Sequence, residues 1–157
     1  MGKRYQSLRS LLNDIKKDVE KGLEVSVGKR VVEIEVEHIK KDVYDAYSPN
    51  TYDRRGTDGG LLDEDNILIT KVDHKTIVIS NETYFNPFTK PDGSYYNNPF
   101  PSYVDLAELI EDGYTILNGG HMEARPFTEN TIKDLNSNKQ HVKALKKFLE
   151  TNGYKIE

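Results

Sequence analysis

Apolar residues recur at a helical spacing through the first third of the chain. In residues 5–23 they follow steps of three and four, with charged residues between them: Tyr5, Leu8, Leu11, Leu12, Ile15, Val19 and Leu23. A one-sided apolar stripe at this period predicts an amphipathic helix that buries one face. Gly22 and Gly28 bracket an expected break before the next segment.

The segment that follows fits two patterns. Residues 32–36 alternate valine or isoleucine with glutamate, as a β-strand does. Over a longer span, one helical stripe joins five residues: Val32, Val36, Ile39, Val43 and Tyr47. The longer period favours a helix over residues 28–47. Residues 1–47 are therefore expected to form a helical arm.

The middle of the chain predicts a loop followed by a hairpin. Residues 51–66 hold three glycines and two arginines, which predicts a well-shaped loop. Two short β-branched runs then follow, at residues 67–70 and 76–80. The turn-forming residues 73–75 between them predict a β-hairpin.

Short elements are expected in the last third of the chain. A helix should end at Gly113, with Ser102 as its N-cap. Residues 114–117 read as a strand, and a final helical pattern starts at Thr128. Polar residues 136–138 are expected to bend or break that last helix.

Together these elements predict an α+β fold, with N-terminal amphipathic helices and a C-terminal helix packed on a small antiparallel sheet. One domain over residues 1–157 is expected, because this length can bury one core and is short for two. Its successive parts are a helical arm (1–47), a loop (51–66), a sheet with an aromatic insertion and a short helix (67–127), and a C-terminal helix (128–157).

Composition excludes several classes of protein. The chain has no cysteine, which removes disulfides, thiol nucleophiles and cysteine metal sites. No stretch approaches the roughly 18 apolar residues of a membrane-spanning helix, so no membrane association is expected. The net charge of −4 weighs against a protein that coats nucleic acid, because such binding depends on neutralising phosphates. A negative charge still permits a channel through which DNA slides.

Residues 81–101 are rich in tyrosine, phenylalanine, proline and glycine. Seven aromatic residues lie within this stretch or just beyond it: Tyr84, Phe85, Phe88, Tyr95, Tyr96, Phe100 and Tyr103. Only 36% of the chain is hydrophobic, so its own core is expected to be thin. Two interpretations fit the stretch about equally: it contacts a neighbouring subunit, or it folds over its own domain and fills the core.

No sequence motif with a defined catalytic mechanism is present. The four histidines lie far apart and lack partners at metal-ligand spacing: His38, His74, His121 and His141. The acidic run at residues 63–66 lacks the alternating register of a calcium loop, so a solvated turn is expected. A solvated helix face is likewise expected for five charged residues: Glu33, Glu35, Glu37, Lys40 and Lys41. We therefore expect no catalytic residue, no cofactor and no metal site.

Short motifs in a fixed order resemble a known family. Residues 43–55 contain Pro49-x-x-Tyr52 and lead into the Arg-Arg-Gly of residues 54–56. Gly-Gly-Leu-Leu-Asp follows at residues 59–63, and the last pieces are Leu-Ala-Glu-Leu-Ile-Glu-Asp-Gly at 106–113 and Arg125-Pro126-Phe127. In this order they resemble the tail-completion, or head–tail joining, minor structural proteins of tailed bacteriophages and prophage-derived tail particles.

The resemblance implies an α+β subunit that assembles as a ring between head connector and tail tube, without catalysis or cofactor. It implies a homo-oligomer, with a hexamer as one ring size, that contacts connector or adaptor proteins and tail-tube or terminator proteins. DNA would pass transiently through the lumen, and the protein would reside in the virion after assembly in the bacterial cytoplasm. The expected interface residues are Tyr52, Arg54, Arg55, Tyr95, Tyr96, Phe100, Arg125 and Phe127.

The Arg125-Pro126-Phe127 motif also has a structural interpretation. Proline is favoured at the first position of a helix, so the motif is expected to start a helix, with Pro126 near that first position and Phe127 as a packing anchor. Two functional alternatives stay open. One is a small phage-encoded, metal-dependent nucleic-acid enzyme or toxin that depends on His121 or Asp65. The other is a different minor virion component, such as a tail terminator.

Overall fold

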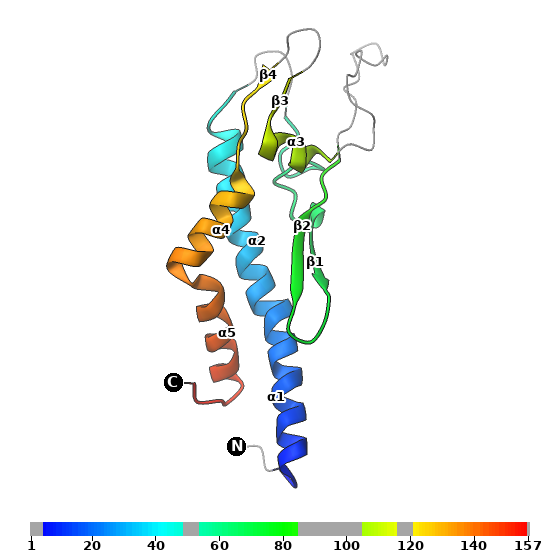
Figure 1. Cartoon of the computed structure of the whole chain (residues 1–157), viewed down its shortest axis with the longest axis vertical. Helices are drawn as coiled ribbons and strands as arrows, with labels where there is room; N and C mark the ends of the chain where they lie inside the picture. The colour runs from blue at the N-terminus through cyan, green and yellow to red at the C-terminus, as the bar shows by residue number, and fades with distance from the viewer. Residues whose placement is uncertain (1–4, 49–53, 85–104, 116–120, 157) are drawn as a thin grey trace. The chain divides into compact units, whose positions relative to one another are not determined.

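The computed structural model describes residues 5–48, 54–84, 105–115 and 121–156 (Figure 1). The chain divides into two compact units. Unit 1 comprises residues 1–34, 69–80 and 131–157, and unit 2 comprises residues 35–68 and 81–130. The described residues form helices and small antiparallel two-stranded sheets, which confirms the α+β class. The single-domain prediction concerns independent folding and stays a prediction.

Helix α1 (Leu8–Gly22) opens unit 1. It begins with a capping box: the Ser7 hydroxyl accepts a hydrogen bond from the Ser10 amide at 3.2 Å, and the Ser10 hydroxyl accepts from the Ser7 amide at 3.3 Å. The expected break between Gly22 and Gly28 is absent. The chain instead stays helical through a π-helical segment, η1 (Leu23–Gly28), into helix α2 (Lys29–His38).

The glycine at the end of α1 serves close packing within unit 1. Helix α5 (Gln140–Thr151) lies beside α1 and η1 (Figure 1). A β-carbon on Gly22 would lie 2.7 Å from Leu145 Cδ1 and 2.8 Å from Phe148 Cδ1 of that helix. Beyond α5, the Tyr154 hydroxyl donates to the Asp18 carboxylate at 2.7 Å, which raises the pKa of the tyrosine.

The expected bend in the C-terminal helical region is confirmed. The region is divided into helix α4 (Phe127–Asn138) and helix α5. Lys139 separates them in the left-handed conformation, with φ of 53°. The polar run before it breaks the helical repeat as predicted.

The expected hairpin is also confirmed. Strands β1 (Ile67–Lys71) and β2 (Ile77–Asn81) pair with each other. Their turn is closed by the Val72 amide, which donates to the Thr76 carbonyl at 3.0 Å. The Asp73 carboxylate accepts from the Lys75 amide at 2.6 Å, which lowers the pKa of that carboxyl.

In unit 2, the helical chain continues as a π-helical segment, η2 (Ile39–Tyr44). The sequence therefore correctly predicts a helix and not a strand at residues 31–36, and the helix ends three residues earlier than expected. The other elements of the unit are the 3-10 turn η3 (Glu64–Asn66), helix α3 (Leu106–Asp112), and the paired strands β3 (Tyr114–Thr115) and β4 (His121–Met122). Among its described residues, the buried apolar ones are Ile39, Val43, Leu61, Ile67, Ala107 and Phe127.

The predicted start of the short helix was wrong. Asp105, and not Ser102, is the N-cap of α3, and Ser102 lies outside the described residues. The Asp105 carboxylate accepts hydrogen bonds from the Ala107 and Glu108 amides at 2.8 and 3.2 Å. The helix begins after Asp105 because its carboxylate accepts hydrogen bonds from two backbone amides that have no partner within the helix. Gly113 ends the helix as predicted, with φ of 71°.

Candidate interaction site

Two arginines from distant parts of the sequence meet at the C-terminal end of η2. Arg54 Nη1 donates hydrogen bonds to the carbonyls of Val43 and Tyr44, at 3.1 and 3.2 Å. Arg125 Nη1 donates to the same Val43 carbonyl at 3.3 Å. The last carbonyls of a helix lack partners within the helix and attract positive charge. Both arginines therefore complete the end of this helix.

The same arginines lie over an exposed tyrosine. The Arg54 guanidinium carbon is 5.0 Å from the centroid of the Tyr47 ring and 5.2 Å from that of Tyr44. The Arg125 guanidinium carbon is 5.1 Å from the Tyr47 centroid. These are cation–π distances, and Tyr47 remains 46% exposed. We call these four residues, Tyr44, Tyr47, Arg54 and Arg125, the Tyr47 cluster.

Arg55 has a different role in the loop beside this cluster. Its side chain donates to the Tyr84 carbonyl at 3.0 Å, and its own carbonyl accepts from the Tyr44 hydroxyl at 2.5 Å. A β-carbon on Gly60 would lie 1.9 Å from the Arg55 carbonyl oxygen, so only glycine fits there. The loop is therefore well shaped as predicted, across its described residues 54–66.

Phe127 is the first residue of α4 and is fully buried. Its predicted role as a packing anchor is confirmed. Pro126 lies at the start of the helix, as predicted: its carbonyl accepts the first helical hydrogen bond, from the Asn130 amide at 2.9 Å. This places Pro126 at the N-cap position and not at the first helical position.

The structure thus brings Arg54 and Arg125 together, sets Arg55 beside them in the loop, and buries Phe127 in the same unit. The other four expected interface residues lie outside the described residues: Tyr52, Tyr95, Tyr96 and Phe100. Interface roles for all eight residues stay predictions.

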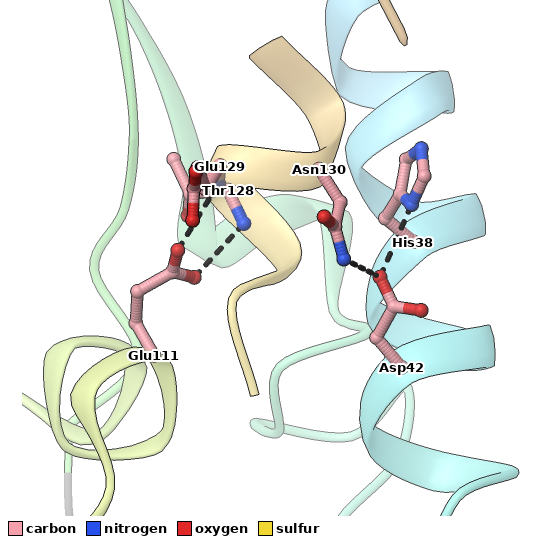
Figure 2. A network of polar contacts seen from close by, with 6 residues as sticks. All are labelled: His38, Asp42, Glu111, Thr128, Glu129 and Asn130. Carbon is pink, nitrogen blue, oxygen red and sulfur yellow. Dashed lines mark hydrogen bonds and ion pairs between the residues drawn. The ribbon is translucent and has the colours of Figure 1, made fainter. Parts of the chain in front are cut away.

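A polar network joins η2, α3 and α4 in the same unit (Figure 2). The Asp42 carboxylate lies 3.1 Å from His38 Nδ1 and accepts from Asn130 Nδ2 at 2.9 Å. On the other side of α4, the Glu111 carboxylate accepts from the Thr128 and Glu129 amides at 2.8 and 3.0 Å. Glu111 of α3 therefore caps the N-terminus of α4, where a negative charge is favourable.

A buried glutamate belongs to this region and was missed from the sequence. Glu35 was expected on a solvated helix face, but it is only 5% exposed. Burial, followed by the negative charge of Glu111, raises its pKa to about 7. The signal was present: position 35 lies three residues after Val32 and four before Ile39, within the apolar stripe. By contrast, Glu37 on the same helix is exposed as expected.

His121 and Asp65, the residues on which the enzymatic alternative depends, form local hydrogen bonds with neighbouring residues. His121 Nδ1 lies 3.0 Å from the Thr115 hydroxyl across the β3–β4 pair. The Asp65 amide donates to the Asp63 carboxylate at 3.1 Å within the η3 turn. Among the described residues, no group of three or more His, Asp or Glu side chains is arranged to hold a metal ion. Within the same residues, no helix is long and apolar enough to span a membrane.

Comparisons with known proteins place the chain in a family. No curated protein and no solved structure matches it. A family model described as YomN matches residues 7–151. This match includes every described helix and strand of both units, and it leaves out only the first six and the last six residues. The chain therefore belongs to the YomN family, a Bacillus phage-derived protein family.

Proposed function

We propose that this phage-derived protein is a virion structural protein at the head–tail junction. In this proposal it forms a ring that completes the tail or joins it to the head connector, and it does not act as an enzyme. Its partners are further copies of itself, connector or adaptor proteins, and tail-tube or terminator proteins. It is assembled into the virion in the bacterial cytoplasm.

The observation that carries the proposal is the Tyr47 cluster. Arg54 and Arg125 come from two of the motifs that resemble head–tail joining proteins, and their side chains meet over one exposed ring. Tyrosine and arginine dominate the binding energy of many protein interfaces. Each guanidinium is already held by backbone carbonyls. Little side-chain freedom would therefore be lost when a partner docks.

The charge of unit 2 also supports this role. It has 17 Asp and Glu residues against 6 Lys and Arg residues, a net charge of −11. An acidic surface does not retain DNA, because affinity for the phosphate backbone depends on neutralising its charge. Such a surface suits a passage through which DNA must slide.

The proposal is tested by replacing the exposed ring. Purified wild-type protein should give a ring-sized mass by light scattering, or should co-sediment with connector-bearing heads or tail tubes. Tyr47→Ala should lose this association, whereas Tyr47→Phe should keep it because the ring remains. Leu68 provides a control, since it is a large apolar side chain that is 40% exposed in the same unit. Leu68→Ala should therefore associate normally.

Three results would contradict the proposal. The first is a wild-type protein that remains monomeric and ignores heads and tails. The second is a folded Tyr47→Ala variant, verified by circular dichroism, that associates as the wild type does. The third is a Mg²⁺- or Mn²⁺-dependent nuclease activity that His121→Ala abolishes and Arg125→Ala leaves intact.

A further inference from the structure

Charge is divided unequally between the two units of this acidic chain. Unit 1 has 16 Lys and Arg residues against 9 Asp and Glu residues, a net charge of +7, whereas unit 2 carries −11. The two values sum to the −4 of the whole chain. One copy of the protein therefore contains a unit of net positive charge and a unit of net negative charge.

Four of the sixteen Lys and Arg residues of unit 1 line a groove. The groove has a volume of about 540 Å³ and lies between the η1–α2 segment and helix α5. Val25 and Phe148 supply apolar surface to it, and its single acidic residue is Glu33. Its four cationic lining residues are Lys29, Arg30, Lys143 and Lys147.

Hydrogen bonds hold the two walls of the groove together. Arg30 Nε of α2 donates to Gln140 Oε1 of α5 at 2.9 Å. Within α2, Arg30 Nη1 also donates to the Glu33 carboxylate at 2.7 Å. Further along, the Ser26 hydroxyl donates to the Ala144 carbonyl at 3.0 Å. The groove is therefore a preformed feature of unit 1, which lowers the ordering cost of binding.

Three of the four cations are available to a ligand. Arg30 is occupied by Gln140 and Glu33. Lys29, Lys143 and Lys147 are exposed, and none of them forms an ion pair within the described part of the chain. Three free ammonium groups beside an apolar floor suit an acidic protein segment that also carries an apolar side chain.

Unit 2 contains a segment with this chemistry. Asp58, Glu64 and Asp65 are exposed around the η3 turn, and their carboxylates form no ion pairs with the described residues. Leu62 is partly exposed beside them. The turn is held in shape by the Asp63 carboxylate, which accepts hydrogen bonds from the Gly59 and Asp65 amides. We call Asp58, Leu62, Glu64 and Asp65 the acidic turn.

We infer that the basic groove of unit 1 binds the acidic turn of a second copy of this chain. The inference deepens the proposed function, and rests on it, because it names a contact between neighbours in the assembly. The two surfaces differ, so the contact is heterologous: each copy offers a groove to one neighbour and a turn to another. Repeated contacts of this kind close into a ring or extend as a filament.

Charge reversal provides the experiment. One variant carries Lys143→Glu and Lys147→Glu, and the other carries Glu64→Lys and Asp65→Lys. Sedimentation velocity at about 0.05 M salt should show that each variant alone self-associates about tenfold or more weakly than the wild type. An equimolar mixture should regain association, because every contact in an alternating assembly is again between opposite charges. Raising the salt to about 0.5 M should weaken wild-type association.

The matched control changes the same charge elsewhere on unit 1. Lys16 and Lys17 are exposed on α1 and do not line the groove. Lys16→Glu with Lys17→Glu should therefore associate as the wild type does. Regained association in the mixture also shows that both charge-reversed variants are folded, so weakened association of each alone cannot come from unfolding.

Several results would overturn the inference. One is a mixture that stays dissociated while a single chain carrying all four reversals behaves as the wild type, because the groove and turn would then pair within one chain. Another is a groove variant that loses binding to a short DNA duplex but self-associates normally, because the groove would then bind nucleic acid. Charge-reversed variants that still assemble normally through Tyr47 would refute this contact and leave the proposed function intact.

Discussion

Glu35→Gln should alter the pH dependence of stability, because it removes a buried group whose pKa is raised by folding. Glutamine has nearly the same shape as glutamate but cannot ionise. Folding raises the pKa of Glu35 from 4.5 to about 7. The stabilising contribution of Glu35 is therefore complete below pH 4.5, where it is protonated in both states. It is lost as the pH rises through about 7, because the folded state must then hold a buried negative charge.

The shift in pKa sets the size of the effect. One pKa unit corresponds to about 1.4 kcal/mol, so the whole shift is worth about 3 kcal/mol as an upper bound. Between about pH 5.5 and pH 8.5 the expected loss of unfolding free energy from Glu35 is about 2 kcal/mol. The wild type should therefore lose about 2 kcal/mol relative to Glu35→Gln across this range, and the variant should be the more stable protein at the alkaline end.

Urea unfolding followed by circular dichroism measures this difference. Both proteins are unfolded at several pH values across the range, and the difference in unfolding free energy is plotted against pH. Glu37→Gln is the control, because Glu37 is exposed on the same helix. Its difference from the wild type should not vary with pH. A Glu35→Gln difference that is equally flat would refute the reasoning that burial shifts this carboxyl.

Two further changes test the core and the polar network of unit 2. Phe127→Ala should lower the unfolding free energy by about 3–5 kcal/mol in urea titrations, because the ring is fully buried, and a loss under about 1 kcal/mol would contradict its role as an anchor. Glu111→Gln should cost about 1 kcal/mol by weakening the cap of α4. It should also bring the Glu35 transition in the pH profile to a lower pH, because a nearby negative charge is removed; an unmoved transition would show that Glu111 does not act on Glu35.

Local patterns in the sequence predicted most of the secondary structure. The apolar stripes located the helices, and the β-branched runs located the hairpin. Residues 32–36 were the hardest case, since valine and isoleucine alternate there as in a strand. The helix formed because Val32, Ile39 and Val43 all became buried, as the longer period requires.

The wrong predictions, for the start of α3 and for Glu35, concern contacts that the spacing of residues in the sequence does not indicate. Ser102 and Asp105 are both good N-cap residues, and only the structure shows which side chain reaches the free amides. Glu35 was assigned to solvent because it is charged, although its position lies within a buried stripe. Its position on the helix places the side chain in the core although the residue is charged. Burial of the carboxyl therefore raises its pKa.

Only the two arginines of the candidate site were predicted from the sequence. Tyr44 was not assigned a role, and Tyr47 was expected only on the apolar stripe of a helix. Arg54 and Arg125 were selected by motif, but nothing in their spacing indicated that both would donate to the Val43 carbonyl. No sequence pattern indicated Glu111, because its role depends on amides 17 and 18 residues further along the chain. Contacts of this range arise from tertiary packing, which a local pattern does not encode.

Half of the cationic side chains of unit 2 are directed at the backbone and not at carboxylates. Unit 2 has only six Lys and Arg residues, and three of them are Arg54, Arg55 and Arg125. Each of these three donates to backbone carbonyls, which carry no net charge. Their guanidinium groups therefore complete the fold, and among the described residues the carboxylates of the acidic turn form no ion pairs. The contact inferred above would give these carboxylates a cationic partner, the lysines of the unit 1 groove in a neighbouring copy.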